Sequence, residues 1–245
     1  PESSAYIGKV DSDYKDEYET AKENGHDVAL VNDKLKIKGI SSTGAAIYRG
    51  WMLKVSEYSE FYKNCLDNRV KLVSDPQQYV TAHYINGWYN RLSDLTPETV
   101  LYANIDEIKQ AELPKWGKYF VKDYVKSLTT KRGSLASNKD EIIDICTQIE
   151  KYRGHIEGGI ALRKFENWES ETEYRVFSYM GKVVVPDASC DVDMCDKIAK
   201  ALKLPFISID LVKNVNGETR LVEIGDGQVS GYKTWDVKRL YQVFA

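Results

Sequence analysis

Cysteine and histidine are scarce in this chain. Its 245 residues contain four cysteines and three histidines, and no two cysteines have the C-x-x-C spacing of a zinc or redox motif. A zinc site is therefore not expected. Unpaired, reduced thiols are the default for a cytoplasmic protein, which is the location that we expect.

Long apolar runs and a strong charge of either sign are also missing. No run approaches the roughly 18 apolar residues that cross a bilayer, and the first residues show no basic and apolar leader. The formal net charge of −3 gives no electrostatic basis for binding duplex nucleic acid or an anionic membrane. We expect neither as a partner.

Apolar strands and helices alternate over about the first 95 residues. Asp27–Val31 and Val70–Val73 are strand candidates, and Ser56–Asn68 is a helix candidate with Ser56 as its N-cap. This alternation predicts a small α/β domain over residues 1–96, with a mainly parallel sheet, followed by a second region over residues 97–245. No G-x-G-x-x-G motif is present, so no dinucleotide site is evident.

The second region places a lysine inside a strand. Lys118–Val125 is rich in strong β-formers and carries Lys122, and Lys126 would lie on the same face. A polar loop follows over Ser127–Ser137, and then a helix from Asn138 to about residue 152. Lysines beside a loop of small residues suit a polyphosphate. The alternative is an edge strand with a solvated lysine beside a loop without function.

Further strands also carry charges. Gly158–Phe165 ends in Arg163-Lys164-Phe165, and the alternation of Glu171–Tyr179 puts Glu173 and Arg175 on one face. Together the strands predict a cleft lined by charged side chains, which are Lys122, Arg163, Glu173, Arg175, Asp210 and Glu223.

Two acidic strands are predicted near the end of the chain. Asn216-Gly217 is a strong hairpin signal, and it would bring Asp210 close to Glu223. Glu223 and Asp226 leave the second strand at a glycine-rich turn, and such oxygen ligands suit a hard cation. The alternative is a solvated aspartate and an ordinary turn.

These segments, in this order, resemble the ATP-grasp superfamily over Leu113–Tyr232. The matching segments are F-V-K-D-Y-V-K, the small-residue loop, G-I-A-L-R-K-F, E-Y-R-V-F, S-I-D-L-V and V-E-I-G-D-G-Q. Compact ligases of the ribosomal-modification type are the most similar members. The resemblance implies an α/β (α+β) ATP-grasp fold with a small Rossmann-like domain before it. It also implies a carboxylate–amine ligase that uses ATP and magnesium, forms an acylphosphate and releases ADP and phosphate.

The resemblance also implies roles for single residues. Lys122 would contact the phosphates with help from Lys126, and Arg175 would stabilise the transferred phosphoryl group, although structural pairing is an equal alternative for it. Asp210, Glu223 and Asp226 would hold magnesium, while Gly225 occupies the position of the usual asparagine ligand. The other expected nucleotide-binding residues are Gly133, Ser134, Arg163, Lys164, Phe165 and Glu173.

The substrates are less defined. Arg49 is a candidate for binding a substrate carboxylate, with a surface salt bridge as the alternative, and His83 is assigned to packing. We expect a carboxylate and an amine carried by small molecules or peptides. A non-catalytic nucleotide-binding or protein-interaction module is the main alternative function. An RNA ligase is disfavoured because no K-x-[DN]-G motif is present.

Overall fold

The structure is a computed structural model, and it describes residues 1–4, 8–169, 171–233 and 235–244. Its residue contacts divide the chain into two units. The first unit contains Pro1–Val80, Arg175–Ile209 and Gly225–Ala245, and the second contains Thr81–Tyr174 and Asp210–Ile224. The expected domains over residues 1–96 and 97–245 stay a prediction.

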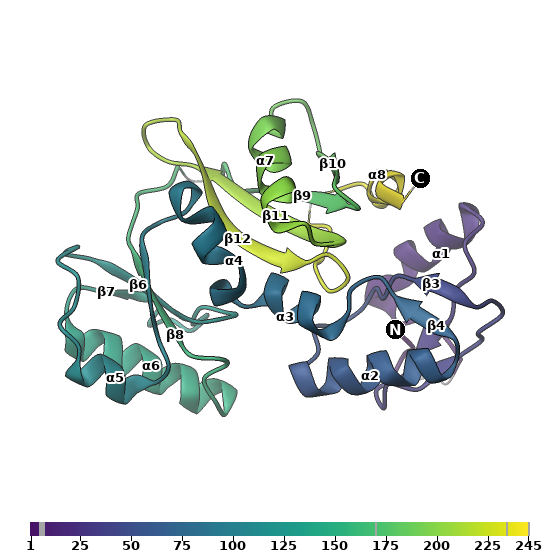
Figure 1. Ribbon diagram of the computed structural model, residues 1–245, viewed down its shortest axis with the longest axis horizontal. Coiled ribbons are helices and arrows are strands. Elements are labelled where there is room, and N and C mark those ends of the chain that lie inside the picture. The colour runs from purple at the N-terminus through teal and green to yellow at the C-terminus, as the bar shows by residue number, and fades with distance from the viewer. Residues whose placement is uncertain (5–7, 170, 234, 245) are drawn as a thin grey trace. The chain divides into compact units, whose positions relative to one another are not determined.

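An antiparallel sheet forms the centre of the second unit. Its strands, in spatial order, are β5 (Thr99–Tyr102), β8 (Ile160–Lys164), β6 (Tyr119–Asp123) and β7 (Leu135–Ala136). Helices α5 (Ile105–Gln110) and α6 (Lys139–Arg153) lie beside each other against this sheet (Figure 1). The buried core between them includes Tyr102, Ile108, Tyr119, Val121, Ala136, Ile142, Ile145, Ile160 and Leu162.

Local capping explains the limits of α6. The Asn138 side chain accepts a hydrogen bond from the Glu141 backbone N–H at 2.9 Å, which is the usual N-cap arrangement. Gly154 ends the helix in a left-handed conformation with φ +81°, as glycine commonly does. The helix predicted from Asn138 to about residue 152 is confirmed.

The lysine strand is shorter than expected. Asp123 Oδ1 accepts hydrogen bonds from the Val125 and Lys126 backbone N–H groups at 2.8 and 2.6 Å, and this turn ends β6 at Asp123. Lys126 therefore lies outside the strand, and the predicted face shared by Lys122 and Lys126 is not formed.

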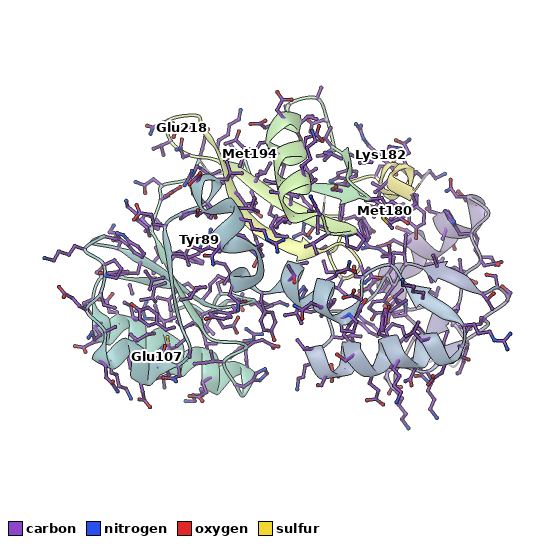
Figure 2. All side chains as sticks on the ribbon, in the orientation of Figure 1. Tyr89, Glu107, Met180, Lys182, Met194 and Glu218 are labelled. Atoms are coloured by element: carbon purple, nitrogen blue, oxygen red, sulfur yellow. The ribbon has the colours of Figure 1, made fainter. Side chains whose placement is uncertain are left out.

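Two helices precede this sheet in the chain, α3 (Pro76–His83) and α4 (Ile85–Leu92), and a 3₁₀ turn follows at Ser93–Leu95. Figure 2 labels Tyr89 on α4. The Tyr89 hydroxyl accepts a hydrogen bond from the Thr99 backbone N–H at 2.8 Å, which connects α4 to β5.

The first unit contains two small sheets. β1 (Leu30–Val31) pairs antiparallel with β2 (Ile37–Lys38), and β3 (Gly44–Ala46) pairs parallel with β4 (Val70–Leu72). Helix α2 (Val55–Asp67) connects β3 to β4, so these three elements form one β-α-β unit. A Rossmann-like domain over residues 1–96 needs a larger parallel sheet and stays a prediction.

Helices from both ends of the chain meet in the first unit. These elements are a 3₁₀ turn at Ser12–Tyr14, α1 (Lys15–Glu23), α8 (Val237–Tyr241) and a 3₁₀ turn at Gln242–Phe244. α1 packs against α8. The buried residues around them include Ala21, Phe177, Phe206, Trp235, Leu240, Tyr241 and Val243.

The largest strands form another four-stranded sheet. Its order is β10 (Lys182–Val184), β9 (Tyr174–Tyr179), β11 (Phe206–Lys213) and β12 (Thr219–Asp226), and α7 (Val192–Leu202) packs on β10 (Figure 1). The turn between β11 and β12 has Gly217 at φ +80°, so the predicted hairpin at Asn216-Gly217 is confirmed. The chain passes between the two units inside both strands.

The protein is thus a mixed helix and strand structure, as expected. Among the described helices, none has the length and apolar character needed to traverse a membrane.

Candidate functional site

The sheet of the second unit presents two different faces. The face toward α5 and α6 carries the apolar core, and the alternation of β6 directs Phe120 and Lys122 onto the other face. In the strand register, Phe120 lies opposite Leu135 of β7 and Arg163 of β8. Cross-strand partners share a face, so these side chains form a row, and Lys122 follows in the next row.

A small pocket lies over this row. Its volume is about 160 Å³, and it is lined by Pro97, Phe120, Leu135, Arg163, Lys164, Phe165, Glu166 and Trp168. The indole N–H of Trp168 is buried and has no hydrogen-bond partner within the described part of the chain. Largely apolar walls with one free donor suit a flat heterocycle that carries an acceptor. The three residues predicted to hold the adenine, Arg163 to Phe165, all lie in this wall.

Lys122 meets a carboxylate in the next row. Its Nζ lies 2.5 Å from Glu223 Oε1, and the side chains of Lys122 and Glu223 are 6% and 37% exposed. A buried ammonium group needs such a partner, because leaving it unpaired is costly. The structure thus brings the predicted phosphate-binding lysine and one predicted metal ligand into direct contact.

The other predicted metal ligands are distributed differently. Asp210 is buried on β11, in the same unit as Glu223, whereas Asp226 belongs to the first unit. Among the described residues, no group of three or more His, Cys, Asp or Glu side chains could hold a metal ion. Magnesium coordination by these residues stays a prediction.

Asp226 has a closed environment within the first unit. The residue is 1% exposed, and its Oδ1 accepts hydrogen bonds from the Gln228 backbone N–H at 2.9 Å and Nε2 at 3.3 Å. Burial raises the pKa of the Asp226 carboxyl to about 6. Gln228 also donates to the Tyr58 hydroxyl and accepts from the Tyr48 N–H. These long-range partners leave no signal in the sequence.

The packing around Gly225 explains its small size. A Cβ atom at this position would lie 2.7 Å from Ser208 Oγ and 2.9 Å from Ser230 Oγ. These two hydroxyls hydrogen-bond to each other at 2.7 Å. An asparagine at position 225 would have to displace this pair, so the space of the usual asparagine is occupied here by two serines.

Arg163 contacts backbone and side-chain oxygens around it. Its Nη1 donates to the Val222 carbonyl at 2.8 Å, and its Nη2 donates to Thr96 Oγ1 at 2.5 Å. Burial lowers the pKa of the Arg163 guanidinium to about 10, and the charge of Glu223 opposes this shift. The sequence suggested only a boundary at Thr96, and the hydroxyl's role was missed.

The remaining residues of the expected hinge have polar partners as well. Lys164 Nζ pairs with Glu98 Oε1 at 2.7 Å, and the Phe165 backbone N–H donates to the Lys118 carbonyl at 3.2 Å. The Phe165 ring also lies under the Lys118 ammonium group, 5.8 Å from the ring centre.

The small-residue loop after β6 is partly ordered by its own hydrogen bonds. Ser134 Oγ accepts from the Leu128 N–H at 2.9 Å, and the Gly133 N–H donates to the Thr130 carbonyl at 3.0 Å. Gly133 has φ +66° and open space around it, and Lys126 is exposed. The expected phosphate contacts of Gly133, Ser134 and Lys126 stay predictions.

Glu173 and Arg175 lie at a junction between the two units. Glu173 is exposed just before β9 in the second unit, and Arg175 begins the next segment of the first. Arg175 Nη1 donates to the Gly231 carbonyl at 2.8 Å, and the Arg175 carbonyl accepts from Trp235 Nε1 at 2.8 Å. The nucleotide-binding role of Glu173 and the catalytic role of Arg175 stay predictions.

Arg49 already has a carboxylate partner. Its Nε and Nη2 donate to the two carboxylate oxygens of Glu17 at 2.7 and 2.8 Å, and its Nη1 donates to the Gly227 carbonyl. This bidentate pair matches the salt-bridge alternative. Substrate binding by Arg49 stays a prediction.

His83 was assigned to packing, and it is indeed buried, at 8% exposure. Burial lowers the pKa of the His83 imidazole to about 4, and the charges that act on it include those of Glu223 and Lys122. A neutral imidazole therefore belongs to the surroundings of the Lys122–Glu223 pair. A single histidine in T-A-H-Y gave no sign of this.

Known structures share this fold. A RimK domain ATP-grasp protein from Sphaerobacter thermophilus DSM 20745 matches with a TM-score of 0.64 and 12% identity, over 96% of both chains. The D-cycloserine synthetase DcsG matches with a TM-score of 0.63 and 14% identity, over 95% of this chain and 94% of that one. The ATP-grasp ligase PsnB complexed with a phosphomimetic variant of its minimal precursor, Mg and ADP matches with a TM-score of 0.58 and 11% identity, over 95% and 94%.

No curated protein matches this sequence. The model of one ATP-grasp domain family, the third family of its clade, matches residues 106–244, which is more than half of the chain. The protein therefore belongs to this ATP-grasp family and is an enzyme of the ATP-grasp ligase class.

Proposed function

We propose that this protein is an ATP-dependent carboxylate–amine ligase. ATP, with magnesium, phosphorylates a substrate carboxylate, and an amine then displaces the phosphate from the acylphosphate to form an amide. ADP and phosphate are the products. The contact between Lys122 and Glu223 is the observation that carries the proposal, since a cation and a carboxylate meet beside a pocket of mainly apolar walls.

The arrangement of the sheet supports a nucleotide in this position. Phe120 lines the pocket, and Lys122 lies two residues further along the same face of β6. A base in the pocket would therefore direct its phosphates toward Lys122. Phosphoryl transfer depends mainly on positioning and on charge neutralisation. Lys122 supplies a positive charge, and Glu223 supplies an oxygen ligand that magnesium accepts.

The Lys122–Glu223 ion pair also predicts how binding proceeds. Lys122 must exchange Glu223 for phosphate oxygens, and Glu223 must exchange Lys122 for a cation. Each exchange compensates the charge that the other leaves unpaired. Nucleotide and magnesium should therefore bind cooperatively.

The substrates belong to the same proposal. PsnB has been described in complexes with precursor peptides, and another similar structure is an L-amino acid ligase from Bacillus licheniformis. We propose a carboxylate and an amine from small molecules or peptides, in the cytoplasm, without nucleic acid or membrane partners.

Calorimetric titration with a non-hydrolysable ATP analogue tests the nucleotide site. We expect binding that requires magnesium and is weakened at least about tenfold by Glu223→Gln or by Lys122→Met. Glu218→Gln is the matched control, because this exposed glutamate lies in the turn between β11 and β12 (Figure 2). Equal binding by all variants, or no binding to the wild type, would contradict the proposal.

Product analysis then separates the functions. A ligase of the proposed kind releases ADP and phosphate when a suitable acid and amine are present, whereas an adenylating enzyme releases AMP and pyrophosphate. Nucleotide binding without turnover for a broad panel of amino-acid and peptide pairs would favour the alternative, a non-catalytic nucleotide-binding module.

A further inference from the structure

A second and larger cavity lies inside the first unit. Its volume is about 530 Å³, within the range of small-molecule sites. All of its lining residues belong to the first unit, so the cavity is independent of the pocket over Phe120. We call it the α1 cavity, and its wall includes Glu17, Ala21, Val28, Ile47, Arg49, Phe61, Val73 and Tyr241.

Two opposite charges form its polar part. The side chains of Glu17 and Arg49 are only 5% and 11% exposed. Arg49 donates three of its five N–H groups, two to Glu17 and one to the Gly227 carbonyl. Within the described part of the chain, one N–H on each terminal nitrogen has no partner. Each Glu17 oxygen accepts one of these bonds and can accept another.

A tyrosine hydroxyl adds to this polar part. Tyr241 lines the cavity at 9% exposure, and no described residue forms a hydrogen bond with its hydroxyl. Burial and the charge of Glu17 raise the pKa of Tyr241, so this hydroxyl stays protonated at neutral pH. It can donate one hydrogen bond to a ligand. The remaining wall is largely apolar, from Ala21, Val28, Ile47, Phe61 and Val73.

We propose that the α1 cavity binds an apolar α-amino acid. The free Arg49 N–H groups would receive its carboxylate, Glu17 would receive its ammonium group, and the apolar wall would contact its side chain. A ligand with both charges matches a site whose own charges cancel. A simple anion would meet Glu17 and a simple cation would meet Arg49, so neither is favoured.

The proposal does not rest on the ligase function, because binding to the α1 cavity requires no nucleotide. It would deepen that function if the bound amino acid is also one of the two substrates. The experiments below therefore contain no ATP, so their failure would leave the nucleotide site untouched.

Calorimetric titration of the full chain with L-phenylalanine and L-leucine is the first test. We expect both to bind, and we expect 3-phenylpropionate and phenethylamine each to bind at least about tenfold more weakly than L-phenylalanine, because each lacks one charged group. L-Glutamate and L-lysine should also bind more weakly, since their charged side chains would face an apolar wall. Absence of binding by both apolar amino acids would overturn the proposal, as would equal binding of the two truncated analogues.

Substitutions test the location. Ala21→Leu adds bulk to the cavity wall, and it should weaken L-phenylalanine binding at least about tenfold. Glu17→Gln should do the same by removing the partner of the ammonium group, and Tyr241→Phe is a milder third variant. Glu19→Gln is the matched control, an exposed glutamate on the same helix outside the cavity wall.

Thermal melting of each variant separates a lost site from a lost fold. If Glu17→Gln fails to fold, Ala21→Leu and Tyr241→Phe still carry the test. Binding that is unchanged in a folded Ala21→Leu variant would overturn the proposal, because the ligand would then lie elsewhere.

Discussion

Asp226 carries the clearest pH-dependent energy at the scale of single residues. Its carboxyl has a pKa of about 6 in the folded protein, compared with an ordinary value of 3.8, because it is buried. The folded state therefore binds the proton more tightly than the unfolded state does. Stability from this group is fully present below pH 3.8 and is lost as the pH rises through 6. A difference of about two pKa units corresponds to about 3 kcal/mol.

The Asp226→Asn variant should remove this dependence. Asparagine keeps an oxygen acceptor for the Gln228 N–H but carries no charge. We expect its free energy of unfolding to match that of the wild type near pH 4 and to exceed it by up to about 3 kcal/mol at pH 7. Urea unfolding at several pH values measures this, with Asp67→Asn, an exposed position on α2, as the control. A constant difference across this pH range would show that burial is not the cause.

Thr96 gives a second prediction for a single side chain. Its buried hydroxyl donates to the Leu221 carbonyl at 2.8 Å and accepts from Arg163. Valine would fill the same space but leave both partners unsatisfied, so Thr96→Val should lower the free energy of unfolding by about 1–3 kcal/mol. The control is Thr147→Val on α6, where the hydroxyl is exposed and bonds only within its own helix. Equal effects of the two changes in denaturant unfolding would contradict the role given to Thr96.

Elements that depend on neighbouring residues could be predicted from the sequence, and those that depend on distant residues could not. The hairpin at Asn216-Gly217 and the helix after Asn138 follow from local turn and cap signals. The early end of β6 is also local, since Asp123 caps its own turn, but the run of β-formers concealed it. The serines that fill the space beside Gly225 lie 17 and 5 residues away from it in the chain, and no local pattern reports such packing.

The start of β8 depends on a glycine at the scale of an element. Gly159 has φ +140°, and a Cβ atom there would lie 2.6 Å from the Tyr102 carbonyl oxygen. Gly154, after α6, has φ +81° but nothing within 4 Å. Gly154→Ala should therefore cost about 1 kcal/mol of unfolding free energy, which is the backbone term alone.

Gly159→Ala carries the same backbone strain together with a clash against the main chain of β5. We expect a cost of about 3 kcal/mol or more in denaturant unfolding. Similar losses for the two variants would mean that β5 can move away from β8 at little cost, and the site-bearing sheet would then be less rigid than its pairing indicates.

The whole molecule offers a test of where its ligands bind. The two units alternate along the sequence, and the chain crosses between them inside β11 and β12. Lys122, Glu223 and every residue of the Phe120 pocket belong to the second unit, whereas the α1 cavity belongs entirely to the first. A bound ligand slows hydrogen exchange most where it removes local opening of the backbone.

Hydrogen exchange measured by mass spectrometry should therefore distinguish the two ligands. The ATP analogue with magnesium should give its largest protection within residues 119–136 and 160–165, and L-phenylalanine should give its largest protection within residues 14–31 and 44–49. Glu223→Gln should abolish the first pattern and leave the second, and Ala21→Leu should do the reverse. If both ligands protect the same segments, or if one variant abolishes both patterns, the assignment of two separate sites is wrong.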